Sequence, residues 1–192
     1  MSRIIAGSRK GHRLHTPPGD GTRPTSDRVR EAAFGVLAFE LGRAGDAAEQ
    51  LSGCSFLDLY AGSGAVGLEA ASRGAHSVVA VEQDRRAAEV IRRNIRETGL
   101  GVRAVAASVE RYLAGPSTPF DICWLDPPYR LPNTTIEAVL IHLLDGWLAP
   151  GALVVVERAR RDQPFAWPDR LGDRWERRYG ETTLFLATEG GE

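Results

Sequence analysis

The clearest indication of the fold lies in Leu57-Asp58-Leu59-Tyr60-Ala61-Gly62-Ser63-Gly64-Ala65-Val66-Gly67. The residues up to Tyr60 belong to an apolar run that predicts a buried strand, and Ala65 opens a helical pattern. The glycines have the spacing G-x-G-x-x-G, which lets a backbone approach a bound ligand closely. A strand, a glycine loop and a helix in this order predict a ligand site at the strand's carboxyl end.

Strand and helix patterns alternate along most of the chain around this loop. Thr25-Ser26-Asp27 offer caps for a helix that extends to about Phe39, and residues 3–15 have the pattern of a small β-hairpin. Alternating elements with short connections predict an α/β fold with a doubly wound, mostly parallel sheet of seven strands. We expect strands at 56–60, 77–81, 102–106, 120–125, 152–157, 175–179 and 183–187, the last two as an antiparallel hairpin, and helices at 65–73, 85–98, 110–113 and 136–144.

The composition is that of an ordinary globular protein, with 43% hydrophobic and 26% charged residues among 192. Cys54 and Cys123 are too few for a disulfide framework or a zinc cluster, and we expect both to be buried free thiols. No apolar run reaches transmembrane length, and residues 1–5 do not begin a signal peptide. We therefore expect a cytoplasmic protein without a membrane partner.

The amino-terminal segment is basic although the whole chain has a net charge of −1. Residues 1–30 hold seven basic and two acidic side chains, a net charge of +5, which leaves −6 for the rest. A local basic patch on a nearly neutral body is typical of a site-specific nucleic-acid enzyme, and the alternative is a solvated basic tail.

The glycine loop alone fits two kinds of ligand. Glu82 lies twenty residues after Gly62, where dinucleotide-binding proteins carry an acid for the ribose hydroxyls, so a nicotinamide enzyme is one interpretation. Asp58, however, lies inside the strand, and a carboxylate there suits a ligand with an ammonium group better than a pyrophosphate. The methionine part of S-adenosylmethionine has such a group.

Asp126-Pro127-Pro128-Tyr129 favours the second ligand, because it follows the strand pattern at 120–125. The two prolines stiffen the loop, and the carboxylate with the Pro127 carbonyl can accept the hydrogens of a planar amino group. The ring of Tyr129 can stack on the base that carries that group. This tetrapeptide resembles the catalytic motif of methyltransferases that use S-adenosylmethionine on exocyclic amino nitrogens, whereas hydride transfer has no need of it.

The whole chain is similar to the bacterial RsmD-type 16S rRNA guanine-N2 methyltransferases. The similarity is carried, in chain order, by Arg3–Gly7, Arg23–Glu31, Leu57–Gly64 and Asp126–Tyr129. It implies a Rossmann-like methyltransferase sheet, residues 25–192, with a small amino-terminal hairpin arm, residues 1–24, that binds RNA. It also implies a monomer that methylates one guanine of small-subunit RNA, within assembled 30S particles.

The resemblance also implies roles for individual residues. Tyr60 either lines the cofactor pocket or packs at the strand end, and Ser108 is shorter than the Asn or Asp of relatives, which weakens its expected adenine contact. The expected cofactor residues are Asp58, Ala61, Gly62, Ser63 and Gly64 at the methionine part, Glu82 at the ribose, Gln83, Ser108 and Val109 at the adenine, and Tyr60. The expected RNA-binding residues are Arg9, Lys10, Arg13, Arg23, Thr25 and Arg28, and the expected catalytic residues are Asp126, Pro127 and Tyr129.

The chemistry expected of this site is positioning rather than covalent catalysis, and it requires neither a metal nor a nucleophilic cysteine. Methylation of adenine N6 or cytosine N4 with the same tetrapeptide is the alternative activity. A non-catalytic RNA-binding module is a third interpretation, which the intact Asp126–Tyr129 disfavours. Arg158, Arg160 and Arg161 either flank the RNA or lie in a solvated loop, and the tryptophans at 124, 147, 167 and 175 are expected mainly in the core.

Overall fold

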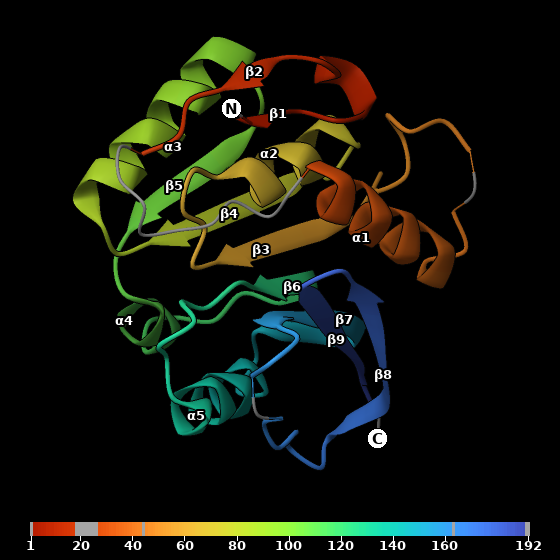
Figure 1. The fold of residues 1–192 in the computed structure, drawn as a ribbon, viewed down its shortest axis with the longest axis vertical. Helices are drawn as coiled ribbons and strands as arrows, with labels where there is room; N and C mark the ends of the chain where they lie inside the picture. Colours follow the sequence, from red (N-terminus) through yellow and green to blue (C-terminus); the bar gives the residue numbers. More distant parts are fainter. Residues whose placement is uncertain (1, 18–26, 44, 163, 191–192) are drawn as a thin grey trace.

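The computed structural model describes residues 2–17, 27–43, 45–162 and 164–190. Its main feature is a sheet of seven strands in the order β5-β4-β3-β6-β7-β9-β8 (Figure 1). β9 is antiparallel to both of its neighbours, and the other pairs are parallel. The strands are β3 (Ser55–Leu59), β4 (Ser77–Glu82), β5 (Val102–Ala106), β6 (Phe120–Leu125), β7 (Leu148–Ala159), β8 (Leu171–Tyr179) and β9 (Thr182–Glu189). The predicted mostly parallel sheet and its terminal antiparallel hairpin are confirmed.

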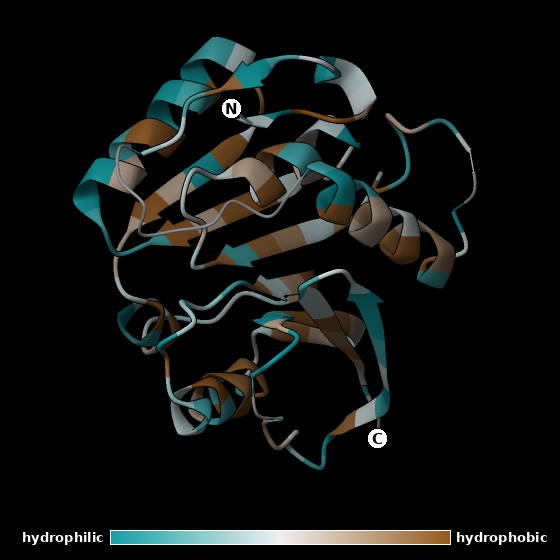
Figure 2. Ribbon diagram, viewed as in Figure 1, coloured by the Kyte–Doolittle hydropathy of each residue, from teal (hydrophilic) through white to brown (hydrophobic). Residues whose placement is uncertain are grey.

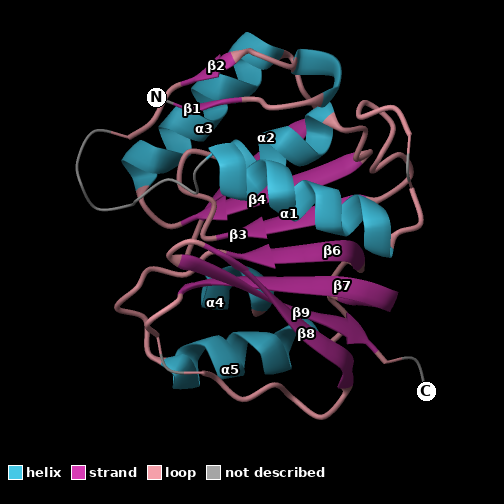
Figure 3. Ribbon diagram, turned by 45° about the vertical axis from the view of Figure 1, so that its right-hand side comes forward, coloured by secondary structure: helices cyan, strands magenta, loops and turns pink. Residues whose placement is uncertain are grey.

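Helices cover both faces of the sheet (Figures 1 and 3). The helices are α1 (Asp27–Glu40), α2 (Ala65–Ser72), α3 (Arg85–Thr98), α4 (Val109–Leu113) and α5 (Asn133–Leu143). α1, α2 and α3 lie on one face, and α4 and α5 on the other. Among the described residues, no helix is long and apolar enough to cross a membrane.

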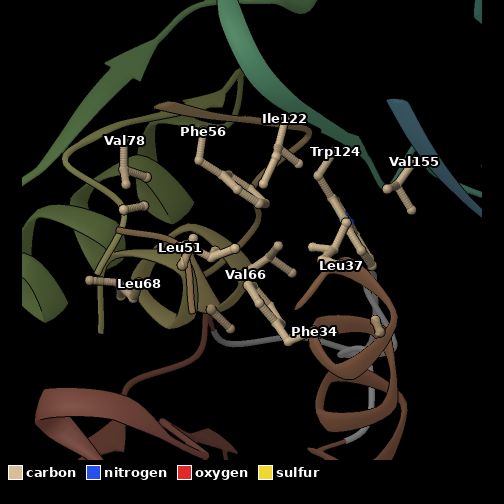
Figure 4. Packing of buried hydrophobic residues seen from close by; sticks show 14 of the residues in the cluster. Phe34, Leu37, Leu51, Phe56, Val66, Leu68, Val78, Ile122, Trp124 and Val155 are labelled. Carbon is tan, nitrogen blue, oxygen red and sulfur yellow. The ribbon is translucent and has the colours of Figure 1, made fainter. Parts of the chain in front are cut away.

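Each face has its own hydrophobic core, because neighbouring side chains of a strand point to opposite faces. Phe56 packs with Phe34, Leu37 and Trp124 under α1 and α2 (Figure 4), whereas Leu57 packs with α4 and α5 on the other face. The alternation places Asp58 on the α2 side, directly beneath the glycine loop.

The tryptophans were expected mainly in the core, and all four pack there, two of them fully or almost fully buried. Trp124 is fully buried and Trp147 is 2% exposed. Trp167 and Trp175 are partly buried and pack against the two cores. β8, which carries Trp175, is the edge strand and is hydrophilic along most of its length (Figure 2), as is typical of an edge that avoids pairing with another chain.

The amino-terminal hairpin is confirmed, but it is packed firmly against the domain. β1 (Ser2–Arg3) and β2 (Arg13–Leu14) pair antiparallel, and a short 3-10 helix, η1 (Gly7–Arg9), forms the tip. Ile4 is fully buried and Leu14 is 4% exposed, both in the core shared with α1 and α2. A Cβ on Gly7 would lie 1.9 Å from the Ser72 carbonyl oxygen, so only glycine allows this approach.

The tip of the hairpin lies at the amino edge of the sheet. The Arg9 side chain donates to the Thr98 carbonyl at 2.6 Å, and its backbone N–H donates to the Ser72 hydroxyl at 3.0 Å. Both acceptors are at the carboxyl ends of helices that return from the carboxyl edge of the parallel strands. Figure 1 accordingly shows η1 on the side away from the arrowheads of β3, β4 and β6.

Candidate functional site

The sequence-predicted site lies where the strand order reverses. From the middle of the sheet, β3, β4 and β5 succeed one another toward one edge, and β6 and β7 succeed one another toward the other edge. The carboxyl ends of β3 and β6 therefore flank a topological switch point. The Asp126 backbone N–H donates to the Leu59 carbonyl at 3.3 Å and joins the two loops. The glycine loop and the Asp126–Tyr129 loop are therefore adjacent, as the sequence predicted.

Asp58 lies beneath the glycine loop and is only 1% exposed. Its Oδ2 accepts a hydrogen bond from the Gly67 backbone N–H at 2.9 Å. Gly67 has to be small, because a Cβ there would lie 3.1 Å from that oxygen and 3.3 Å from Val78. The Asp58 carboxylate therefore sits at the start of α2, below the backbone that is expected to hold a ligand.

The electrostatic state of Asp58 is unusual. The pKa of its carboxyl is raised to about 8: burial is the largest cause, the negative charges of Asp126 and Glu82 act in the same direction, and the Gly67 hydrogen bond acts in the opposite direction. Two other predicted site carboxylates thus lie close enough to act on Asp58. Such a group favours a cationic ligand, because a positive charge nearby would stabilise its ionised form.

Glu82 fixes the glycine loop to the end of β4. Its two oxygens accept from the backbone N–H groups of Gly62 and Asp84, each at 2.8 Å. Gly62 and Gly64 have φ values of 55° and 76°, which glycine adopts without steric cost. A carboxylate has about four acceptor positions, so Glu82 retains capacity for the hydroxyls of a ribose.

Tyr60 has two features that suit a ligand site. Among the described residues, Tyr60 is the one residue other than glycine that has a positive φ, at 62°. This conformation costs energy and often occurs at binding sites. Its hydroxyl is buried without a hydrogen-bond partner among the described residues, and burial followed by the charge of Glu110 raises the pKa of the phenol. A buried hydroxyl without a partner is costly, so a polar group of a bound ligand would stabilise it.

The residues expected at the adenine follow β4 and β5 at the same edge. Gln83 is exposed and Val109 is buried. The Ser108 hydroxyl oxygen caps α4 by accepting from the Arg111 N–H at 3.3 Å, and its O–H remains available as a donor. The adenine contacts of all three residues remain predictions.

The Asp126–Tyr129 loop combines a partly buried Asp126, a buried Pro127 and a Tyr129 that is 51% exposed. An exposed ring beside a partly buried carboxylate can receive a planar base from solution. The loop has a support that the sequence did not reveal, because Arg158 Nη1 donates to the Pro128 carbonyl at 3.4 Å.

Arg158 corrects one of the sequence-based interpretations. It is 5% exposed, and its Nε lies 3.1 Å from Asp162 Oδ2. Arg158 therefore points inward and supports the Asp126–Tyr129 loop, whereas the sequence favours an exposed position, beside RNA or in a solvated loop. Its place at the end of the buried β7 was the signal that could have indicated this.

Asn94 on α3 is a second residue that the sequence did not single out. It is 1% exposed. Its Oδ1 accepts from the His15 N–H at 2.9 Å, and its Nδ2 donates to the carbonyls of His15 and Ser63, each at 3.0 Å. Asn94 thus joins the glycine loop to the segment that follows the hairpin. A lone asparagine on the buried face of an amphipathic helix was the available signal.

Asn94→Ala is expected to weaken cofactor binding about tenfold, because the Ser63 carbonyl loses its partner and the loop its support. Titration calorimetry with the demethylated cofactor measures this below the melting temperature. Thr98→Val is the matched control, since the Thr98 hydroxyl donates to the Asn94 and Ile95 carbonyls and accepts from the Leu100 N–H, none of which belongs to the glycine loop. If both variants lose stability but bind equally well, Asn94 has a structural role only.

The expected RNA-binding residues are not brought to this site as a group. Arg9, Lys10 and Arg13 are exposed on the hairpin, and Arg9 lies at the edge opposite the catalytic loop. Arg28 is exposed in the first turn of α1. Arg23 and Thr25, and the predicted arm boundary between residues 24 and 25, lie outside the described residues.

Arg30 does not belong to the exposed basic surface, although it contributes to the charge of residues 1–30. It is 1% exposed, donates to Asp27 Oδ1 at 3.0 Å and to the Arg3 carbonyl, and lies 3.9 Å from Glu69. Burial lowers the pKa of Arg30, and the charges of Glu69 and Asp27 oppose that shift. It is part of the buried network that fixes the hairpin to α1 and α2.

The fold and the site together define a Rossmann-like methyltransferase. The antiparallel β9 inserted between β7 and β8 differs from the strand order 3-2-1-4-5-6 of dinucleotide-binding sheets. The family described as Conserved hypothetical protein 95 matches residues 2–188. The chain belongs to this family, that of the ribosomal RNA small subunit methyltransferase D proteins.

Comparisons with individual proteins agree with this assignment. Ribosomal RNA small subunit methyltransferase D of Escherichia coli K12 is 38% identical over 157 residues, which cover 81% of this chain and 73% of that protein. The solved structure of yhhF, a candidate methyltransferase from Escherichia coli, has a TM-score of 0.83 and 33% identity, covering 100% of this chain and 99% of the other.

A more distant solved structure shares the fold. It is the 16S rRNA N2-guanine methyltransferase RsmC of Thermus thermophilus with AdoMet and guanosine, at 22% identity and a TM-score of 0.65. The match covers 90% of this chain and 44% of that one.

Proposed function

We propose that this protein transfers a methyl group from S-adenosylmethionine to N2 of one guanine in 16S rRNA, as a cytoplasmic monomer that acts on assembled 30S particles. The observation that carries the proposal is the convergence of Asp58 and Asp126 at the switch point, where the charge of Asp126 contributes to the raised pKa of Asp58. The relationship to rRNA small subunit methyltransferases supports rRNA as the substrate class.

S-adenosylmethionine is the methyl donor of this class, and the residues of the site fit it. Asp58 is a buried carboxylate whose raised pKa favours a cationic partner, and the buried Tyr60 hydroxyl has no partner within the described chain. Glu82 keeps acceptor positions for ribose hydroxyls. When bound, this molecule supplies an electrophilic methyl group on a sulfonium.

The catalytic loop would hold the amino group of the target base. The lone pair of the guanine amino nitrogen is delocalised into the ring, which makes it a poor nucleophile. Asp126 and the Pro127 carbonyl accept its two hydrogens and favour a geometry in which the lone pair faces the methyl group. Tyr129 stacks on the base, a contact worth about 1–3 kcal/mol, once the base has left its own stack.

The proposal is tested by tritium transfer from labelled cofactor to naked 16S rRNA, 30S particles and DNA, followed by nucleoside analysis. N2-methylguanosine from 30S particles is the expected product. Recovery of N6-methyladenine or N4-methylcytosine would instead establish the alternative amino-methyltransferase activity. Absence of transfer to any of the three substrates, from protein that binds the cofactor, would contradict both.

Replacement of Arg9, Lys10 and Arg13 by alanine tests the expected RNA role of the hairpin. We expect lower RNA affinity and a salt slope reduced by about 0.7–0.9 for each phosphate that is no longer neutralised, as measured by filter binding. The triple variant Arg92→Ala, Arg93→Ala, Arg96→Ala removes the same charge from the exposed side of α3 and serves as the control. If the salt slopes of RNA binding are equal for the two triple variants, Arg9, Lys10 and Arg13 belong to a solvated surface and make no specific RNA contact.

Point substitutions are preferable here to deletion of residues 1–15. The deletion would remove the core residues Ile4 and Leu14. It would also strip buried Glu69 of the Ile5 and Ala6 N–H groups that donate to it at 2.7 and 3.0 Å. Glu69 would keep its ion pair with Arg73 at 2.8 Å but lose both backbone donors, so the truncated protein would report on folding rather than on RNA.

A further inference from the structure

The charged residues at the carboxyl edge of the sheet differ on the two sides of the switch point. At the ends of β4 and β5, on the side that holds the expected cofactor residues, the acids Glu82, Asp84 and Glu110 stand beside the exposed Arg85, Arg86 and Arg111. On the β6–β7 side, the exposed charges that follow the strands are Arg130, Arg160 and Arg161. We expect the substrate to approach from this second side, because Asp126 follows β6 and the expected cofactor residues lie on the first.

The turn after β7 directs two of these arginines outward. The Asp162 N–H donates to the Ala159 carbonyl at 2.9 Å, and Asp162 Oδ2 accepts from the Ala159 N–H at 3.2 Å. The same oxygen pairs with the inward-pointing Arg158 at 3.1 Å. The neighbouring acid is thus engaged by partners other than Arg160 and Arg161.

The turn that carries Arg130 lies beside this one. The Pro128 carbonyl accepts both from the Leu131 N–H at 2.8 Å and from Arg158 Nη1 at 3.4 Å. Arg158 therefore links the catalytic loop to the turn of residues 159–162. Arg130, Arg160 and Arg161 are all exposed, and none of them has an ion pair or side-chain hydrogen bond within the ranges that the structure describes.

Among the described residues, acids also lie near this basic surface: the partly buried Asp126 and the exposed Glu181. Glu181, in the turn between β8 and β9, is exposed, and its carbonyl accepts from the Arg160 N–H at 2.8 Å. The three exposed guanidinium groups outnumber these two carboxylates, so this rim keeps a net positive charge. Guanidinium groups match phosphate geometry, and exposed phosphate contacts set the register of a nucleic acid without reading its sequence.

We propose that Arg130, Arg160 and Arg161 form a second RNA-contacting surface, which binds the phosphates that flank the target nucleotide. It lies at the catalytic edge, whereas Arg9 at the hairpin tip lies at the opposite edge. Contacts to the RNA phosphates on either side of the flipped base would hold that base against Tyr129. The inference rests on the proposed function, since it takes RNA as the substrate.

The double variant Arg160→Ala, Arg161→Ala tests the proposal. For naked 16S rRNA, we expect affinity to fall about tenfold and the salt slope to fall by about 1.4–1.8, as for two phosphates that are no longer neutralised. Affinity for the demethylated cofactor and the melting temperature should stay unchanged, because both side chains are exposed. The Arg160→Lys, Arg161→Lys variant should keep most of the salt slope, since the charges remain.

The matched control is Arg93→Ala, Arg96→Ala, which removes the same charge from α3. An equal loss of affinity in control and test variants, or unchanged binding in the test variant, would overturn the proposal. The outcome is separable from that of the proposed function. Failure of the wild-type protein to methylate RNA would contradict the proposed function. Equal salt slopes for the test and control variants would contradict only the second RNA-contacting surface.

Discussion

Asp126→Ala is expected to reduce methyl transfer by about 100-fold or more, the scale on which loss of one preorganised polar group acts in other enzymes. The residue is only partly buried at the end of β6, so folding should depend on it far less than turnover does. Cofactor affinity should stay within a few-fold. The measurement is single-turnover methyl transfer beside calorimetric binding of the demethylated cofactor.

Asp121 provides the control for this prediction, because it lies at the other end of the same strand. Its Oδ2 accepts from the Ser55 N–H and hydroxyl, each at 2.7 Å. Asp121→Ala should therefore lower stability and leave the turnover of folded protein nearly unchanged. Near-normal turnover by the Asp126→Ala variant would contradict the prediction and show that Asp126 is not needed for methyl transfer.

The regular elements were predictable because their patterns are local. The predicted strands at 102–106 and 120–125 and the helix at 85–98 have the bounds of β5, β6 and α3. Asp84 caps α3 by accepting from two backbone N–H groups, and Gly99 ends it with φ at 66°. Signals of this kind lie within a few residues of the boundary that they set.

The contacts that assemble the site were not predictable in the same way, because their partners are distant in the chain. Arg30 counts as a basic residue in the sequence, yet its burial depends on Glu69 and on the backbone of Arg3. Asn94 gains its role from His15 and Ser63. A charge count or a helical period contains no information on such pairings, so these residues were identified only from the three-dimensional arrangement.

The glycine loop shows how the structure decides between two interpretations. Its spacing and Glu82 fitted a dinucleotide as well as S-adenosylmethionine. The antiparallel β9 and the electrostatic contact of Asp58 with Asp126 are features that the spacing could not contain. The position of β9 departs from the strand order of dinucleotide-binding sheets, and the contact of Asp58 with Asp126 brings the glycine loop and the amino-group motif into one site, so both features favour the methyltransferase.

Cofactor binding is expected to release a proton from Asp58. Burial raises the pKa of its carboxyl to about 8 in the free protein, so the group is largely neutral at pH 7. A cationic ligand favours the ionised form. Affinity should therefore rise with pH up to about 8, and then fall as the ligand's own amino group, with an ordinary pKa of about 7.7–8.0, loses its charge.

Asp58→Asn should abolish this proton release and weaken cofactor binding by about 10- to 100-fold at pH 8, the range for a hydrogen bond to a charged group. The asparagine oxygen can still accept from the Gly67 N–H, so the loop keeps its support. Titration calorimetry at pH 7, in two buffers with different ionisation enthalpies, counts the released protons. Equal proton release by the variant and the wild type would assign the proton to another group.

The stability of the free protein offers an independent measurement of the same carboxyl. Its pKa in the folded chain lies above the unfolded value of about 3.9, so the folded state binds more protons between these two values. The contribution of Asp58 to stability therefore falls as the pH rises from about 4 to about 8. Asp58→Asn lacks this dependence, and its melting temperature relative to the wild type should increase across that interval. A constant difference between the two proteins from pH 5 to pH 9 would contradict the raised pKa, and with it the predicted proton release.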